Sequence, residues 1–155
     1  MKLISSILLT TALLTTTVSA QDGDWYGGVQ LSGLSIKKDI SNNSTLQGIV
    51  NFWGYGYDVD VFSFTGRYIR KVKQERYYNL FWAAGAGITT VSASNSNLGT
   101  AIHAAAGVGA EYDVRGLDRN FIPLFISAEI DAGFVSVSGY GGAGVGIDLG
   151  LHYKF

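Results

Sequence analysis

Apolar and polar residues alternate strictly along the last part of the chain. From Ala143 to Phe155 every second residue is apolar or aromatic, and the residues between them are small, polar or charged. Successive side chains of a β-strand point to opposite faces, so 142–155 is predicted to form one strand with an apolar and a polar face. The apolar face covers roughly 13 residues at about 3.3 Å each, which is long enough to cross a bilayer at a tilt.

The same alternation continues upstream and is interrupted by turn signals. Ser, Asn, Gly and charged residues cluster near residues 32, 42, 56, 74, 96, 117 and 139 and divide the chain into segments. Ile49, Trp53 and Phe81 are apolar residues that break the pattern. The predicted strands are 25–31, 34–40, 45–54, 59–72, 76–91, 100–114, 121–137 and 142–155.

These strands predict an all-β fold, an eight-stranded antiparallel up-and-down transmembrane β-barrel. Every connection is short, so strands adjacent in the sequence are expected to pair antiparallel. An even number of strands lets the first pair with the last, which would remove both open edges of the sheet. With this closure, Trp25 is expected to lie beside Phe155 on the outer face of the barrel.

The N-terminus has the pattern of a cleaved signal peptide. Lys2 is followed by a mostly apolar run from Leu3 to Leu14 and by small residues at Val18-Ser19-Ala20. The run is about a dozen residues and a membrane-spanning helix needs about 20, so the helix is the weaker alternative. Residues 1–20 are therefore predicted to be the signal peptide and 21–155 the barrel domain.

Composition narrows the classes of function. The chain has 11 basic and 12 acidic residues, and this near balance argues against a nucleic-acid partner. It has no cysteine, so disulfides do not stabilise this exported domain, whereas a closed hydrogen-bonded barrel in lipid would. Glycine is abundant with 21 residues, which suits strands that bend or crowd in a narrow lumen.

Alternation alone leaves open which face is outside. A soluble, calycin-like barrel would place the apolar face around an apolar ligand. Three features favour lipid outside: small residues crowd the polar faces, charged residues there are few enough to pair, and aromatics gather near strand ends as in interfacial girdles. The aromatics near the predicted ends are Trp25, Tyr26, Tyr57, Tyr68, Tyr78, Tyr112, Tyr153 and Phe155, of which Trp25, Tyr68, Tyr78 and Tyr112 form the predicted girdle.

The long alternating last strand with its final aromatic resembles the last strand of bacterial outer-membrane β-barrels. By pattern, the whole of 21–155 resembles the small eight-stranded barrels of the OmpA and OmpX type. The resemblance implies location in the bacterial outer membrane, with both termini in the periplasm. It also implies that the barrel-insertion machinery reads Leu151, Tyr153 and Phe155 as a signal. Outer-membrane lipid is then the surrounding partner, and a monomer is expected.

The most suggestive polar residues are predicted to face the lumen. Glu129 and Asp131 lie on one strand and Asp148 and His152 on the next, and the hairpin register places Glu129 nearly opposite Asp148. Two carboxylates this close would need a cation, which Arg67, His103 or Lys154 could supply. The full predicted lumen charge cluster is Arg67, His103, Glu111, Glu129, Asp131, Asp148 and His152.

Two interpretations of this cluster remain. It could form a proton or cation path or an acid/base pair, or it could be a salt-bridged plug that satisfies buried charges, which the pattern favours. No metal site or cofactor is predicted. Gly139–Gly144 matches G-x-G-x-x-G, but no helix follows that could hold a phosphate.

The sequence predicts a protein that is not an enzyme. A lipid deacylase needs a Ser–His–acid set at the lipid face, whereas both histidines, His103 and His152, fall on predicted inward faces. The expected function is a structural or surface-interaction role for an outer-membrane barrel whose lumen is filled by side chains. The alternatives are a secreted or periplasmic barrel that binds an apolar ligand and, third, a lipid-modifying outer-membrane enzyme.

Overall fold

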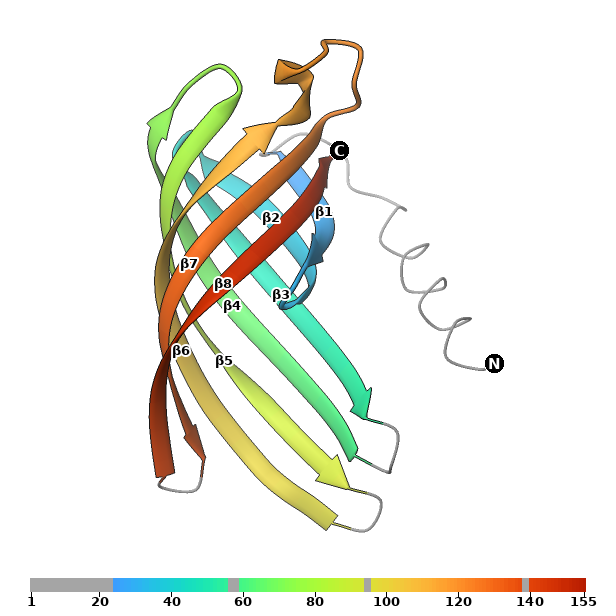
Figure 1. The fold of residues 1–155 in the computed structure, drawn as a ribbon, viewed down its shortest axis with the longest axis vertical. Helices are drawn as coiled ribbons and strands as arrows, with labels where there is room; N and C mark the ends of the chain where they lie inside the picture. Colours follow the sequence, from blue (N-terminus) through green and yellow to red (C-terminus); the bar gives the residue numbers. More distant parts are fainter. Residues whose placement is uncertain (1–23, 56–58, 94–95, 138–139) are drawn as a thin grey trace, which may run out of the picture.

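The computed structural model describes residues 24–55, 59–93, 96–137 and 140–155, which form eight β-strands and one short 3-10 helix (Figure 1). The predicted signal peptide and the predicted turns at 56–58 and 138–139 lie outside these residues. No helix in the described ranges is long and apolar enough to span a membrane. The elements are β1 (Trp25–Gln30), β2 (Gly33–Ser41), β3 (Ser44–Tyr55), β4 (Val59–Gln74), β5 (Tyr78–Ala93), β6 (Ser96–Asp113), η1 (Val114–Gly116), β7 (Leu124–Val137) and β8 (Tyr140–Lys154).

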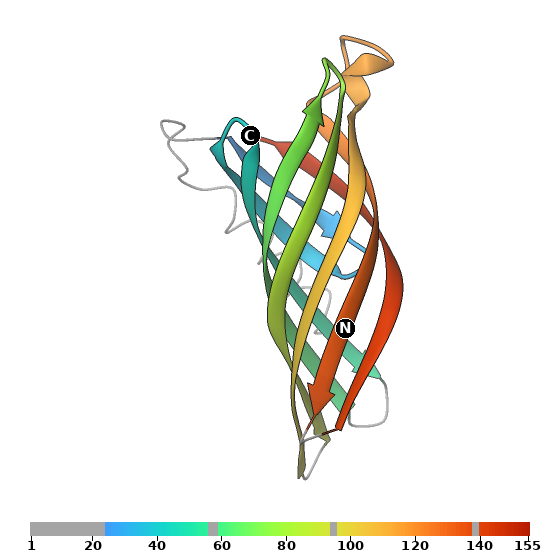
Figure 2. The same cartoon turned by 90° about the vertical axis from the view of Figure 1, so that its left-hand side faces the viewer.

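The strands form a closed up-and-down barrel, which confirms the predicted fold class. Each strand pairs antiparallel with the next, and β1 pairs with β8. The end that carries Trp25, Phe155 and the turns near residues 42, 76 and 117 is called the terminal end, and the other is called the far end. Figures 1 and 2 show that the six strands from β3 to β8 extend well beyond the β1–β2 hairpin toward the far end.

Strand boundaries differ from the prediction at a few places. Residues 76–77 and 121–123 were expected in strands but lie in the turns at the terminal end. Ser96 was expected in a loop but begins β6, because the β5–β6 ladder continues past a register shift between Val91 and Ser92. Gly99 lies at this shift with φ of 131°. This backbone conformation favours glycine because it has no Cβ.

The apolar face of the strands points out of the barrel, as the girdle and lumen patterns predicted. Val108, Ile130 and Ile147 are 64%, 57% and 69% exposed on this outer surface. On each strand from β5 to β8 the outward apolar positions run for about 11 residues, which matches the ~9–11 residues of a tilted transmembrane strand. The outward residues that bound this apolar band toward the far end are Asp60, Thr90, Thr100 and Ser136.

The two apolar residues Ile49 and Phe81 break the alternation because they face inward. Ile49 is 4% exposed and Phe81 is 5% exposed. Phe81 packs with Ile69 and Ala83 in a small buried apolar cluster within the terminal half of the lumen. These residues fill space beside the polar side chains, so the misfits in the sequence mark the apolar part of the lumen.

The first hairpin is too short to close the barrel along its whole length. β1 pairs with β8 only from Tyr26 to Gln30, and the last contact is the Leu31 N–H donating to the Leu149 carbonyl at 3.0 Å. Within the described residues, β8 before Leu149 is paired only with β7, and β3 beyond Val50 only with β4. The expectation that closure would remove both edges is therefore wrong for the half of the barrel nearer the far end, because β1 and β2 stop midway.

Replacing Phe81 by alanine should lower the free energy of unfolding by about 3–5 kcal/mol, because it leaves a cavity beside Ile69 and Ala83. Urea unfolding of the protein in lipid vesicles measures this change. Leu117→Ala is the matched control, because Leu117 is 73% exposed in a turn and its truncation should change stability by less than about 0.5 kcal/mol. Equal losses in the two variants would contradict the inward packing of Phe81.

Candidate functional site

Polar side chains fill the lumen of the terminal half and hydrogen-bond to one another across the barrel. They come from every strand except β5, and they lie together because the inward positions of neighbouring strands share one register. We call this set the lumen network. Its members are Tyr26, Gln30, Ser35, Lys37, Asp39, Thr45, Gln47, Arg67, Lys71, Glu111, Glu129, Asp131 and His152.

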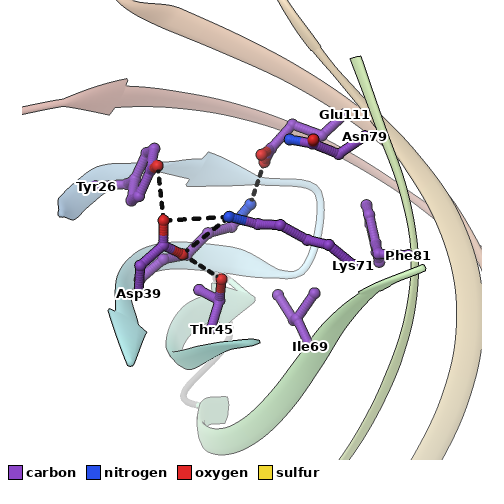
Figure 3. Close-up of a pocket in the computed structure, with 9 residues that line it drawn as sticks. Tyr26, Asp39, Thr45, Ile69, Lys71, Asn79, Phe81 and Glu111 are labelled. Carbon is purple, nitrogen blue, oxygen red and sulfur yellow. Dashed lines mark hydrogen bonds and ion pairs between the residues drawn. The ribbon is translucent and has the colours of Figure 1, made fainter. Parts of the chain in front are cut away.

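Asp39 organises the part of the network nearest the terminal end (Figure 3). Its carboxylate accepts a hydrogen bond from the Tyr26 hydroxyl at 3.0 Å and from the Lys71 Nζ at 3.1 Å to each oxygen. Thr45 donates to the same carboxylate. The ring of Tyr26 packs edge-on against Phe125 at 5.4 Å between centroids. One carboxylate thus joins strands β1, β2, β3 and β4.

Lys37 and Glu111 form a buried ion pair next to this group. Their Nζ and Oε2 atoms are 2.8 Å apart, and the two side chains are 6% and 10% exposed. A cavity of about 10 Å³ is lined by this pair, Asp39 and Phe81. Figure 3 draws the side chains around it. A volume of ~10–15 Å³ holds about one water molecule, so this part of the lumen has no room for a larger ligand.

His152 points inward from β8 in the terminal half and is completely buried. Its Nε2 is 2.9 Å from the hydroxyl oxygen of Ser35, which also accepts a hydrogen bond from Gln47 at 2.8 Å. Gln47 donates to Gln30 at 2.6 Å as well. The Nδ1 atom of His152 is buried without a hydrogen-bond partner in the described part of the chain.

Arg67 holds the pair of acidic residues on β7. Its guanidinium forms ion pairs with Glu129 and, at 3.5 Å, with Asp131. Glu129 also lies directly opposite Asp148 in the β7–β8 ladder, where the hairpin register placed it. Asp148, however, accepts a hydrogen bond from Ser32 at 2.5 Å and makes no ion pair with Arg67.

The structure does not bring the predicted lumen charge cluster together as one site. Arg67, Glu129 and Asp131 form one group, and Glu111 pairs with Lys37 instead. His103 lies elsewhere, with its ring nitrogens 2.8 Å from Thr65 and 3.4 Å from Thr89. Lys154 was a candidate cation for the acidic pair, but it forms an ion pair with Asp24 at the terminal rim.

Sequence reasoning missed the lumen residues of the first hairpin, above all Lys37 and Asp39. Along β2 the inward set is Ser35, Lys37 and Asp39, and it alternates with outward residues that include Ile36 and Ile40. Two adjacent lysines at 37 and 38 hide this period, because one faces the lumen and the other faces outward. The signal that could have found Lys37 is the polar residue at every second position, Ser35, Lys37 and Asp39.

The aromatic residues near the terminal end lie mostly on the outer surface. Trp25, Tyr68, Tyr78 and Tyr112 all sit in this zone, with Tyr78 paired opposite Tyr112 and Tyr68 packed on Trp82. Tyr26 was also expected there, but its side chain points into the lumen because it precedes outward Gly27. Tyr57 lies outside the described residues.

The final residues close the ring as expected. The Phe155 N–H donates to the Trp25 carbonyl at 3.0 Å, and the Tyr153 and Phe155 rings lie 5.4 Å apart. Leu151 and Tyr153 are outward on β8, opposite Val29 and Gly27 of β1. The predicted insertion residues therefore form the outer seam between the first and last strands.

The ion pair between Arg115 and Asp113 holds the connection between β6 and β7 at the terminal end. Asp113 caps η1 by accepting from the Arg115 backbone N–H at 3.0 Å and from its Nε at 2.9 Å. This side-chain hydrogen bond to Arg115 lowers the pKa of Asp113. Among the residues that the structure describes, no three His, Asp or Glu side chains converge as a metal site.

Truncating Lys37 to methionine should lower the free energy of unfolding by about 3–5 kcal/mol, because Glu111 would be left buried without its cation. Urea unfolding in vesicles measures the loss. The double variant Lys37→Met/Glu111→Leu removes both charges and should recover most of the lost stability. If the double variant were as unstable as the sum of the two single variants, the ion pair would not be the reason.

No protein-family model matches the chain, and no curated protein sequence matches it. The N-terminal β-barrel domain of Pseudomonas aeruginosa OprF is similar in structure, with a TM-score of 0.54 and 16% identity over 85% of this chain and 94% of that domain. Ail, the attachment invasion locus protein of Yersinia pestis, aligns over 87% of this chain and 100% of its own at 13% identity, but its TM-score of 0.38 is too low to support an argument. The chain thus shares its fold with the small eight-stranded outer-membrane barrels that its sequence resembles.

Proposed function

We propose that the protein is a non-catalytic β-barrel of the bacterial outer membrane with a structural or surface-interaction role. The observation that carries this proposal is the apolar outer band of about 11 residues on β5 to β8, a height that fits the hydrocarbon of a tilted barrel. The girdle at the terminal end borders this band. A soluble barrel for an apolar ligand would need the opposite arrangement, with its apolar face turned inward.

The lumen network supports a plugged barrel and not a pore. Three buried or half-buried cations, Lys37, Arg67 and Lys71, each contact an acidic side chain. The salt-bridged plug is thus the better interpretation of the charges that the sequence placed in the lumen, because paired charges do not offer an ion a free path. The protein would add a stiff, closed body to the membrane, with its far-end turns presented at the cell surface.

The Ser35–His152 contact does not make a convincing nucleophile pair. His152 is 0% exposed, so a substrate would have no access to Ser35 beside it. The Nδ1 atom of His152 lacks the acid partner that would orient the ring in a catalytic triad. His103 contacts only the hydroxyls of Thr65 and Thr89 among the side chains described. These features support a protein that does not modify lipids.

The C-terminal strand supports a role in assembly. Leu151, Tyr153 and Phe155 lie outward on β8, where the first and last strands meet. We propose that the barrel-insertion machinery recognises these residues before β1 and β8 pair. Outer-membrane lipid then surrounds the assembled barrel.

Substituting Val108 by arginine tests the membrane-embedded position. Val108 lies on the outer surface near the middle of the apolar band, so a charge there should destabilise the barrel in vesicles by about 2–4 kcal/mol. Thr100→Arg is the matched control on the same strand, because Thr100 lies at the polar border and should cost about 0–1 kcal/mol. The measurement is urea-dependent refolding in lipid vesicles.

Fractionation completes the test. The native protein should separate with the outer membrane and should migrate differently on a gel before and after heating, because a folded barrel resists detergent. Recovery of the protein in the soluble periplasmic fraction, together with equal stability of Val108→Arg and Thr100→Arg, would contradict the proposal.

A further inference from the structure

The barrel has a side opening toward the far end, bounded by the free edges of two strands. β8 from Tyr140 to Asp148 and β3 beyond Val50 each have one neighbour only within the described residues. Figure 1 shows the far ends of these strands on opposite sides of the barrel. Nearer the terminal end the β1–β2 hairpin fills the space between them. Toward the far end the opening is therefore two strands wide, roughly 14 Å at about 4.8 Å per spacing.

The side opening extends from the far end into the apolar band. On β8 the outward residues Ala143, Val145 and Ile147 belong to this band and also lie on the free edge. The Leu149 carbonyl accepts from the Leu31 N–H, so odd-numbered residues of β8 direct their backbone groups toward β1. The backbone N–H and C=O groups of 143, 145 and 147 therefore point into the opening. Hydrocarbon would not satisfy them, and a lipid-exposed sheet edge is not stable at this depth.

The inward glycines of β8 have no explanation within the chain itself. A Cβ at Gly87 or Gly107 would collide with a neighbouring backbone carbonyl, so glycine there is required by the chain's own packing. A Cβ at Gly142, Gly144 or Gly146 would meet nothing within 4 Å. Glycine in a strand often marks the close approach of another backbone, and these three lie on the free edge.

Asp148 lies at the end of this free edge that is nearer the terminal end. It is 7% exposed, and its Oδ1 atom has no hydrogen-bond partner in the described part of the chain. Its Oδ2 accepts from Ser32 in the β1–β2 turn. A buried oxygen without a hydrogen-bond partner thus lies beside the β1–β2 turn, where the free edge of β8 begins. In a monomer in lipid, the hydrogen bonding at this point would be incomplete.

A second copy of the chain fits this opening. Two barrels in one membrane with the same orientation can be related by a two-fold axis along the barrel. Because β8 runs from the far end and β3 runs toward it, this axis places β8 of each copy antiparallel to β3 of the other. The far-end stretch of each free edge is then paired in both copies, with no residue supplied from elsewhere.

We propose that two copies pair through their side openings, with β8 from Tyr140 to Gly144 against β3 from Tyr55 to Asn51 of the second copy. This register aligns the far ends of both strands and keeps outward residues together, so that Ala143 lies beside Phe52 of the second copy on the outer face. Phe52 is 70% exposed in one copy. Leu31, in the turn of the β1–β2 hairpin, also points outward and is 62% exposed. The dimer replaces the monomer that the sequence led us to expect, and it rests on the membrane location under Proposed function.

Cysteine cross-linking tests the pairing directly, because the native chain has no cysteine. Phe52→Cys and Ala143→Cys, carried on differently tagged copies, are co-expressed and treated in intact membranes with a short bis-maleimide. We expect a shift from monomer to a covalent dimer that carries both tags. Ile102→Cys with Ala143→Cys is the matched control, because Ile102 is outward and 64% exposed on β6, both of whose edges are paired. This pair should stay monomeric.

A second variant separates edge pairing from chance proximity. Gly141→Pro removes an N–H that points into the opening within the paired stretch and leaves the β7–β8 ladder intact, so the monomer should fold while the cross-linked dimer is lost. Gly141→Ala adds the same Cβ beside the Phe134 ring but keeps the N–H, so it should keep the dimer. The proposal is overturned if the Phe52 and Ala143 variants stay monomeric, if both cysteines in one chain link within that chain, or if the edge links to a different protein. Loss of the membrane fraction itself would instead overturn the proposed function.

Discussion

The hydrogen-bonding of the backbone is the constraint on which the rest of this structure depends. Strands β3 to β8 are long, and the backbone N–H and C=O groups between them are paired in extended antiparallel ladders. In a medium without water, such ladders are stable only when the sheet has no exposed edge. The alternation of side chains follows from the same geometry, because a strand paired on both sides offers only two faces, one for the surroundings and one for the lumen.

The lumen of the terminal half must also accommodate buried charges. A barrel of eight strands has an interior that its own side chains can fill, and here several of them are charged. Asp39 and Glu111 are each held by a lysine, and Arg67 holds Glu129 and Asp131. Removing one member of such a pair is costlier than removing both, so the lumen network acts as a unit that fixes the relative positions of β2, β4, β6 and β7.

The strand pattern could be predicted from the sequence because alternation is a local property with a period of two. The eight strands, their antiparallel order and the Glu129–Asp148 register all follow from it. The partners of the lumen charges could not be predicted in the same way. Which cation faces Glu111 depends on the tilt of strands far apart in sequence, and Lys37 lies 74 residues away on the far side of the ring. The turn between β1 and β2 was predicted near residue 32, where the structure has it, but the loss of a partner for β3 and β8 beyond that turn was not predicted.

The short β1–β2 hairpin explains why the residues that face the lumen differ between the two halves of the barrel. Where β1 and β2 are present, the ring is complete, narrow and filled by paired charges. Beyond Leu31 the ring loses two strands, and the inward positions of β7 and β8 become valine and glycine, at Val135, Val137, Gly142 and Gly144. Charged side chains would not find partners across so wide a gap, whereas small residues leave the space and the backbone of β8 open to another strand. The change from a charged to a glycine-rich inner face at Asp148 therefore follows the change in strand number at the same level of the barrel.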